Sequence, residues 1–387
     1  MNSLSRYKQV LAKILFDLPG WRTDKKIIVF ESDDWGSIRM PSREVFDKLK
    51  SDGYGVDNDP FLKYDNLAGE NDLSGLFEVL TSVKDSNGRP AIFTANTMVA
   101  NPDFARIEES GFLNYFYEPF TETLSRIPTH RNSFNLWKEG MTSGVFHPQF
   151  HGREHLNVDR WMKALQAGDP AIRRAFGHRM LSISSEPNEM RFGYMEALDH
   201  FSPEEKQIKA SVVEDGLRLF KRIFGFDSRS FIACCYVWDN EIEKILQSRG
   251  VNYIQGVAQQ LIPAYDDNRH YFKKALHYIG QSNSFNQIYL TRNAFFEPAL
   301  LGSGNDHIGY CLNRMSAAFR MKKPAIVASH RLNYIGSIHK ENRDHNLILL
   351  KKLLNEIVRR WPEVEFMTSD ELGGLISKEQ NSRVKLS

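Results

Sequence analysis

The chain has 387 residues, 41% of them hydrophobic, and a formal net charge of only +2. This much apolar material suffices for one large α/β domain or two ordinary ones. A near-neutral charge without a block of Lys or Arg argues against nucleic acid as a partner.

The N-terminal segment Met1–Trp21 carries Lys8, Lys13 and Asp17 among its apolar residues. These charges interrupt the apolar stretch that a signal peptide or a membrane span requires, so we expect an amphipathic leader helix instead. Three cysteines are an odd number for a disulfide framework, which favours free thiols. The sequence therefore predicts a cytoplasmic protein without a membrane span.

Eight short β-rich runs alternate with segments of helical periodicity. We expect strands at 26–31, 90–96, 144–147, 230–237, 251–255, 287–292, 324–329 and 363–367, and helices at 42–51, 74–84, 158–167, 208–224, 239–249, 309–321 and 342–360. Strands separated by helices form parallel sheets, and about eight such units form a barrel with its chemistry at the carboxyl ends of the strands.

Three stretches, residues 37–73, 100–143 and 152–207, are longer than a minimal barrel needs. Long excursions over the mouth of a barrel usually shape a binding site. We therefore expect a single domain, residues 1–387, with these stretches as insertions.

Two adjacent carboxylates, Asp33 and Asp34, follow the first predicted strand, and His147 and His151 follow the third. Carboxylate and imidazole are good zinc ligands, and a catalytic zinc usually takes three protein ligands and one water. Positions i and i+4 of a helical turn face the same way, and Pro148 is favoured at the first position of such a turn. We expect one divalent ion, zinc first, on Asp34, His147 and His151, which leaves Asp33 as the base.

Other polar and aromatic residues surround this predicted centre. His155 repeats the four-residue step after His151 and is the alternative to either imidazole as a ligand. Otherwise His155 and Arg153 should contact the substrate or support the ligands. Trp35 should shape the turn that presents the carboxylates, and Asn96 lies at the end of the second predicted strand.

The order of these motifs resembles that of the metal-dependent polysaccharide deacetylases, the fourth carbohydrate esterase family. Phe30-Glu-Ser-Asp-Asp-Trp-Gly36 is similar to the family's Thr-Phe-Asp-Asp-Gly motif, and Ala91-Ile-Phe-Thr-Ala-Asn96 to its second strand. His147–His151 is similar to its His-x-x-x-His motif, and Ala328-Ser-His330 to the late strand that ends in a catalytic His. The resemblance covers about residues 26–370 and implies a distorted (β/α)7 TIM-like barrel.

The chain departs from the family pattern in two places. The motif Arg-x-Pro-Tyr or Phe-Gly should fall near residues 229–239, where Tyr236 fits but both prolines are missing and Arg229 lies several residues too early. In the family this Arg orients the catalytic Asp. The family's Asp-x-x-Trp motif is not recognisable either, which leaves open a different substrate or a different reaction at the same metal.

The resemblance implies a metal-dependent hydrolase that removes an N- or O-linked acetyl group from a sugar or polysaccharide precursor. Asp33 would be the base and His330 the acid, and a backbone N–H near Tyr236 would stabilise the oxyanion. A non-catalytic sugar-binding protein is one alternative. The other is a glycoside hydrolase whose two carboxylates would combine Asp33 or Asp34 with Asp239, Glu297 or Asp370.

Overall fold

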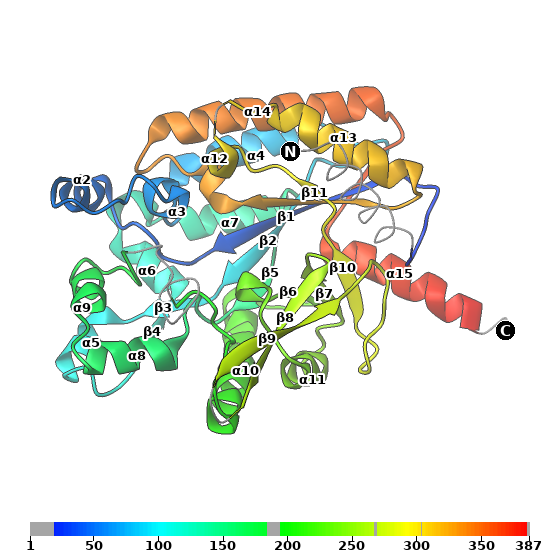
Figure 1. Ribbon diagram of the computed structural model, residues 1–387. Coiled ribbons are helices and arrows are strands. Elements are labelled where there is room, and N and C mark those ends of the chain that lie inside the picture. Colours follow the sequence, from blue (N-terminus) through cyan, green and yellow to red (C-terminus); the bar gives the residue numbers. More distant parts are fainter. Residues whose placement is uncertain (1–18, 184–193, 267–268, 303, 385–387) are drawn as a thin grey trace, which may run out of the picture.

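The computed structural model describes residues 19–183, 194–266, 269–302 and 304–384. The predicted leader helix, apart from its last three residues, and residues 184–193 of the third insertion lie outside this part of the chain. A parallel nine-stranded sheet forms the centre of the molecule (Figure 1). Its strands are β1 (Ile27–Trp35), β2 (Phe93–Met98), β5 (Phe146–Gly152), β6 (Ser230–Ile232), β7 (Tyr253–Gly256), β10 (Ile288–Thr291), β11 (Ala294–Phe295), β12 (Ala325–His330) and β13 (Glu365–Met367).

The sheet curls until its two edges meet in one stretch of chain. The strand order is β10-β7-β6-β5-β2-β1-β12-β11, with β13 added to β1. Only Arg292 and Asn293 separate β10 from β11. The Arg292 N–H donates to the Gly256 carbonyl on β7 at 2.8 Å, and the Asn293 N–H donates to the Ile326 carbonyl on β12 at 3.1 Å. One bent strand thus closes the barrel, and the eight strands of the path become seven when β10 and β11 count as one.

Helices cover the outside of the curled sheet (Figure 1). The main hydrophobic core lies under helices α4 (Glu70–Thr81), α7 (Ser133–Thr142), α13 (His307–Arg320) and α14 (Lys340–Arg360). A second core lies under α10 (Pro203–Phe224) and α11 (Asn240–Ser248), and a third under α15 (Ser369–Val384). No helix among the described residues has the length and apolar character needed to span a bilayer.

The insertions build a separate layer over the carboxyl ends of β1, β2 and β5. The first holds α2 (Arg43–Ser51) and α3 (Pro60–Tyr64), and the second holds β3 (Ala100–Pro102), α5 (Phe104–Glu109), β4 (Tyr117–Pro119), α6 (Phe120–Arg126) and η1 (Pro128–His130). The second insertion ends in α7, which is not part of this layer and packs on the main core. The third holds α8 (Val158–Gln166), α9 (Pro170–Gly177) and the first turn of α10. The remaining short elements are η2 (Cys234–Tyr236), β8 (Gln259–Tyr265), β9 (His270–Leu276), α12 (Pro298–Leu301) and η3 (Arg331–Tyr334).

Polar side chains inside the barrel form a chain of hydrogen bonds that ends at Asp33. Asn96 donates to Asp33 Oδ1 and to Gln255 Oε1, both at 2.8 Å. Gln255 in turn donates to Ser230 Oγ at 2.8 Å, and the Ser230 N–H donates to Gln149 Oε1 at 2.7 Å. Hydrogen bonds between buried polar side chains hold these side chains in fixed orientations, although Asn96 Oδ1 has no partner among the described residues.

The predicted fold class, an α/β barrel of the TIM type with long insertions, is confirmed. Each predicted strand overlaps an observed one, although the strand predicted at 230–237 ends at Ile232. The chain then turns into η2, where Cys235 and Tyr236 adopt positive φ of 54° and 59°. The hairpin β8–β9 and helix α15 are absent from the sequence prediction.

Candidate active site

The first strand delivers both predicted carboxylates through an irregularity in its pairing. The register between β1 and β2 shifts between Ser32 and Trp35, and Asp34 adopts a positive φ of 71°. Gly36 also has positive φ, and a Cβ there would lie 2.2 Å from the Met98 carbonyl oxygen. Such strained backbone persists only where the surroundings hold it. Asp33 and Asp34 can therefore both present their side chains at the same end of the barrel.

The predicted helical turn at His147–His151 is wrong, because these residues form most of strand β5. Residues four apart on a strand lie about 13 Å from each other. His147 sits near the start of β5, opposite Thr94, and its Nε2 lies 3.2 Å from Asp370 Oδ1. The structure therefore does not bring His147 to Asp34, and a ligand set of Asp34, His147 and His151 cannot hold one ion.

His151 and His155 meet Asp34 instead, at the carboxyl end of β5 and in the loop that follows. Nε2 of each imidazole lies 3.4 Å from Asp34 Oδ1. Two ligand atoms that are each about 2.1 Å from a tetrahedral zinc are about 3.4 Å apart. Each imidazole therefore lies at a ligand-to-ligand distance from the carboxylate, and one carboxylate with two imidazoles is a donor set that suits a divalent metal ion.

Hydrogen bonds and burial prepare these three groups as ligands. His151 Nδ1 donates to the Ile232 carbonyl at 2.8 Å, which directs the Nε2 lone pair at Asp34. Burial lowers the pKa of His155 to about 3, so its imidazole is neutral. Burial acts to raise the pKa of Asp34, but its interactions with His155, Arg39 and His151 outweigh burial and hold that pKa well below its usual range. Arg39 Nη2 donates to Asp34 Oδ2 at 3.2 Å, which leaves Oδ1 toward the imidazoles.

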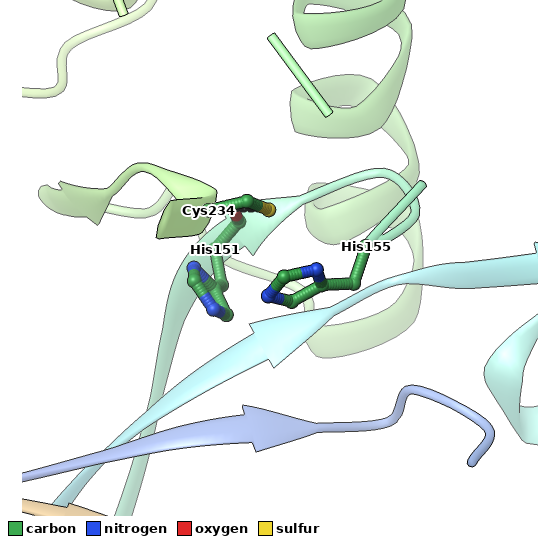
Figure 2. Close-up of side chains that lie close together, drawn as sticks. All are labelled: His151, His155 and Cys234. Atoms are coloured by element: carbon green, nitrogen blue, oxygen red, sulfur yellow. Dashed lines mark hydrogen bonds between the residues drawn. The ribbon is translucent and has the colours of Figure 1, made fainter. Parts of the chain in front are cut away.

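A buried thiol lies beside the two imidazoles. Figure 2 shows Cys234, from η2, with its sulfur turned toward His151 and His155. In the described part of the chain, these three residues form a buried group whose donor atoms all lie within 4.8 Å of one another. A His-His-Cys group of this size can bind a metal ion.

The other predicted carboxylate, Asp33, is held by Arg292 from the point where the barrel closes. Nη1 and Nη2 of Arg292 donate to Asp33 Oδ2 and Oδ1 at 2.6 and 2.7 Å, and its Nε donates to Glu31 at 2.6 Å. Burial acts to raise the pKa of Asp33, but the Arg292 charge and hydrogen bonds lower it to about 2. Asp33 is therefore ionised and fixed in orientation.

His330, the predicted acid, lies opposite Asp33 on the neighbouring strand. Its Nε2 is 3.8 Å from Asp33 Oδ2, and its Nδ1 contacts Glu297 Oε1 at 2.7 Å. Burial acts to lower the pKa of His330, but the charge and hydrogen bond of Glu297 raise it to about 10. His330 is therefore protonated at neutral pH, and its Nε2–H faces the base.

Asp33, Asp34, His151, His155 and His330 open onto one cavity of about 270 Å³. Its polar lining includes Asp33, Asp34, Arg39, Asp59, His151, His155, Tyr236 and His330, and its apolar lining includes Ile38, Phe61, Leu62, Leu181, Met195 and Ile232. Phe61 packs edge-on against His330, with ring centroids 5.4 Å apart. The cavity therefore combines reactive groups on one wall with an apolar wall supplied largely by the insertions.

The remaining predicted site residues lie outside this cavity. Trp35 is buried in the main core, where its indole packs against Trp137 and Phe146, so it does not contact the cavity. Arg153 makes ion pairs with Glu154 and Asp215 and so braces the loop that carries His155. Asn96 supports Asp33 directly, as described above.

Three charged residues of the site were missed or misassigned by the sequence prediction. Arg292 takes the place that the missing family Arg left open, although it lies on a different strand. Glu297, predicted only as a candidate glycosidase carboxylate, orients His330. Arg39 had no signal beyond its position five residues after Asp34. The contact of Arg292 with Asp33, 259 residues away in sequence, comes from barrel closure, which no local motif encodes.

Comparisons with known proteins report similar folds but no family. No family model and no curated protein matches the chain. Similar solved structures include a protein described as a polysaccharide deacetylase from Mycobacterium smegmatis, at 10% identity, 94% coverage of both chains and a TM-score of 0.42. An allantoinase is 9% identical over 91% of both chains, with a TM-score of 0.45. A 4-α-glucanotransferase from Thermococcus litoralis is 8% identical with a TM-score of 0.42, and the match spans 90% of this chain but only 40% of that one.

Proposed function

We propose that this protein is a metal-dependent hydrolase that removes an acetyl group, N- or O-linked, from a sugar or polysaccharide precursor. One observation carries the proposal. Asp34, His151 and His155 converge beside an ionised Asp33 and a protonated His330 on the wall of one cavity. Phe61 and Tyr236 supply aromatic surface in the same cavity, which suits a sugar ring.

Asp34, His151 and His155 would hold the metal ion, for which zinc is our first choice. When bound, such an ion polarises a carbonyl group and lowers the pKa of a water molecule toward neutrality. In the proposed reaction Asp33 accepts a proton from the attacking water. His330 donates a proton to the leaving amine or alcohol as the bond to the acyl carbon breaks.

We propose that the oxyanion is stabilised by the hydroxyl of Tyr236 and not by the backbone N–H that the resemblance implies. The backbone N–H of Tyr236 already donates to the Ala233 carbonyl at 3.1 Å. Its phenol lines the cavity, and burial raises the pKa of Tyr236 to about 12, so the hydroxyl keeps its proton. We therefore assign the hydrogen bond to the oxyanion to Tyr236 Oη.

The carboxylates considered for a glycoside hydrolase do not suit that reaction. Such an enzyme needs one carboxylic acid that stays protonated, whereas the pKa values of Asp33 and Asp34 are lowered. Asp239 and Asp370 pair with His200 and His147 and are not part of the cavity lining. Glu297 is engaged by the His330 cation. Deacetylation therefore accounts for the ionisation states better.

A screen for acetate release tests the proposal. Metal-reconstituted protein would be offered N- and O-acetylated monosaccharides, nucleotide sugars and oligosaccharides. Asp33→Asn should bind the metal normally and lose about 10²–10⁴-fold in turnover, because it removes only the base. Release of acetate that Asp33→Asn leaves unchanged would contradict the assignment of the base. No release from any acetylated sugar, with the metal bound, would contradict the substrate class.

A further inference from the structure

The geometry points to Cys234 as a fourth protein ligand of the metal ion that His151 and His155 hold. This inference rests on the proposed metal site and adds a sulfur donor to it. The ligand set would then be one carboxylate, two imidazoles and one thiolate, a combination selective for thiophilic ions.

The position of the Cys234 sulfur is the first evidence that it can bind the same ion as the two imidazoles. Cys234 Sγ and one nitrogen from each imidazole lie within 4.8 Å of one another, and all three residues are buried. Ligands of a zinc ion with sulfur and nitrogen donors lie about 3.5 Å apart, given bond lengths of about 2.3 and 2.0 Å. The three donors, which come from the side chains drawn in Figure 2, are therefore at most about 1.3 Å farther apart than ligands of one zinc ion.

A second observation, independent of the cysteine, is that the ring of His155 is not held by a hydrogen bond at its other nitrogen. His155 is 6% exposed, and its Nδ1, which is not the nitrogen that faces Asp34, has no hydrogen-bond partner among the described residues. A histidine ligand is usually fixed by a hydrogen bond from this second ring nitrogen, so no such partner restrains the ring of His155 from adjusting toward an ion shared with Cys234. Within the described part of the chain, Sγ of Cys234 makes one hydrogen bond, a long contact of 3.8 Å to the His151 carbonyl, which holds the thiol weakly.

Asp34 and Cys234 approach the imidazoles from different sides. Asp34 lines the cavity. Cys234 is not part of that lining and packs in the interior with Met98 and Ala197. A sulfur ligand from the interior leaves the cavity side free for water or substrate, since catalytic zinc can expand to five ligands.

The two other cysteines provide matched controls. Cys235 is the chain neighbour of Cys234 and lines the cavity, whereas Cys311 is buried on α13 in the main core. None of the three cysteines forms a disulfide bond. Cys235→Ser therefore tests the adjacent thiol, and Cys311→Ser tests the general effect of changing a buried thiol.

The experiment is a cobalt titration of the full-length, metal-free protein, followed by absorption spectroscopy. A thiolate ligand gives an intense near-ultraviolet charge-transfer band with Co²⁺. We expect this band in the unchanged protein, in Cys235→Ser and in Cys311→Ser, and its loss in both Cys234→Ser and Cys234→Ala. Zn²⁺ affinity, measured by competition with a chelator, should fall about 10-fold or more in the Cys234 variants. The reason is that mutation of a residue that only hydrogen-bonds a metal ligand already lowers metal affinity by about 10–100-fold.

Each outcome decides a separate point. Cobalt that binds without the charge-transfer band would overturn the role of Cys234 and leave the proposed site of Asp34, His151 and His155 intact. A band that survives in both Cys234 variants but disappears in Cys235→Ser would assign the sulfur to the wrong cysteine and overturn the inference. Failure of the unchanged protein to bind cobalt or zinc would contradict both the inference and the metal site on which it rests.

Discussion

Asp33 and His330 are held in complementary ionisation states by two separate ion pairs. Arg292 lowers the pKa of Asp33 to about 2, and Glu297 raises that of His330 to about 10, although burial opposes both shifts. Between these values Asp33 is ionised and His330 is protonated. The two groups, 3.8 Å apart, therefore keep over this pH range the ionisation states that the proposed base and acid require.

Glu297→Gln tests the origin of the high pKa of His330. In the unchanged protein the acid stays protonated until pH rises through about 10, so activity that depends on it is lost only above that pH. Without the Glu297 charge, the pKa of His330 should fall toward its ordinary value of about 6.5, and the alkaline limb of kcat against pH should move down with it. Asp344→Asn, a change at an exposed carboxylate, should leave the profile unchanged. An alkaline limb that stays in place in Glu297→Gln would exclude His330 as the acid.

Tyr236→Phe removes one hydroxyl and keeps the aromatic ring in the cavity. Because loss of a single oxyanion donor costs about 10²–10³-fold in kcat, we expect a loss of that size with little change in KM or in metal affinity. Tyr334→Phe is a suitable control, since its buried hydroxyl contacts Ser329 and lies outside the cavity lining. Equal losses in both variants would indicate a general structural effect and remove Tyr236 from the mechanism.

The sequence predicts four of the central residues, and its one error at the metal site has a physical cause. Asp33, Asp34, His151 and His330 all follow or end apolar runs, which is a local signal. The choice of His147 over His155 came from ending the third strand too early. That strand continues through Gln149, a polar residue that is buried because its Oε1 accepts hydrogen bonds from Ser228 and Ser230. Such cross-strand partners cannot be inferred from the local pattern.

At the scale of elements, the bent strand β10–β11 both closes the barrel and places Arg292 against Asp33, the proposed base. Arg292 lies where this strand changes its partner from β7 to β12, and its side chain is fully buried with Glu31 and Asp33. A guanidinium placed there pairs with two carboxylates that would otherwise repel each other inside the barrel. The same residue therefore stabilises the fold and orients the base.

Arg292→Ala should destabilise the protein by about 3–5 kcal/mol, because it leaves buried carboxylates without a partner. The free energy of unfolding in urea would measure this. Arg229→Ala, at an exposed arginine in the region where the family motif is expected, should stay within about 0.5 kcal/mol of the unchanged protein. A small effect of Arg292→Ala, similar to that of Arg229→Ala, would contradict the structural part of this account.

Elements that carry a simple hydrophobic pattern were predictable, and those that depend on tertiary contacts were not. The central parallel strands are apolar runs between helical segments. Strand β9 is mostly half-buried or exposed and includes Lys273 and Lys274, so its pattern does not indicate a buried strand. Helix α15 contains Gly373, which weakens the helical signal but allows the close approach of the Tyr253 ring.

At the scale of the whole molecule, the site is assembled from strands that are far apart in sequence. Strand β1 carries the proposed base and one proposed metal ligand, β5 and its following loop carry the two proposed histidine ligands, and β12 carries the proposed acid. The insertions add Arg39 and the apolar wall around Phe61. This arrangement at the carboxyl ends of parallel strands is the one in which barrel enzymes usually place their chemistry.

The most direct test of the central claim is the zinc affinity of two single variants, His155→Ala and His147→Ala, measured on the metal-free protein by chelator competition. His155 lies against Asp34 and His151. Loss of a residue that only hydrogen-bonds a metal ligand lowers metal affinity by about 10–100-fold. Loss of His155, a proposed ligand itself, should therefore weaken zinc binding by at least this factor. His147 pairs with Asp370 at the other end of β5, so its loss should leave zinc affinity unchanged. Unchanged affinity in His155→Ala together with lost affinity in His147→Ala would contradict the site described here.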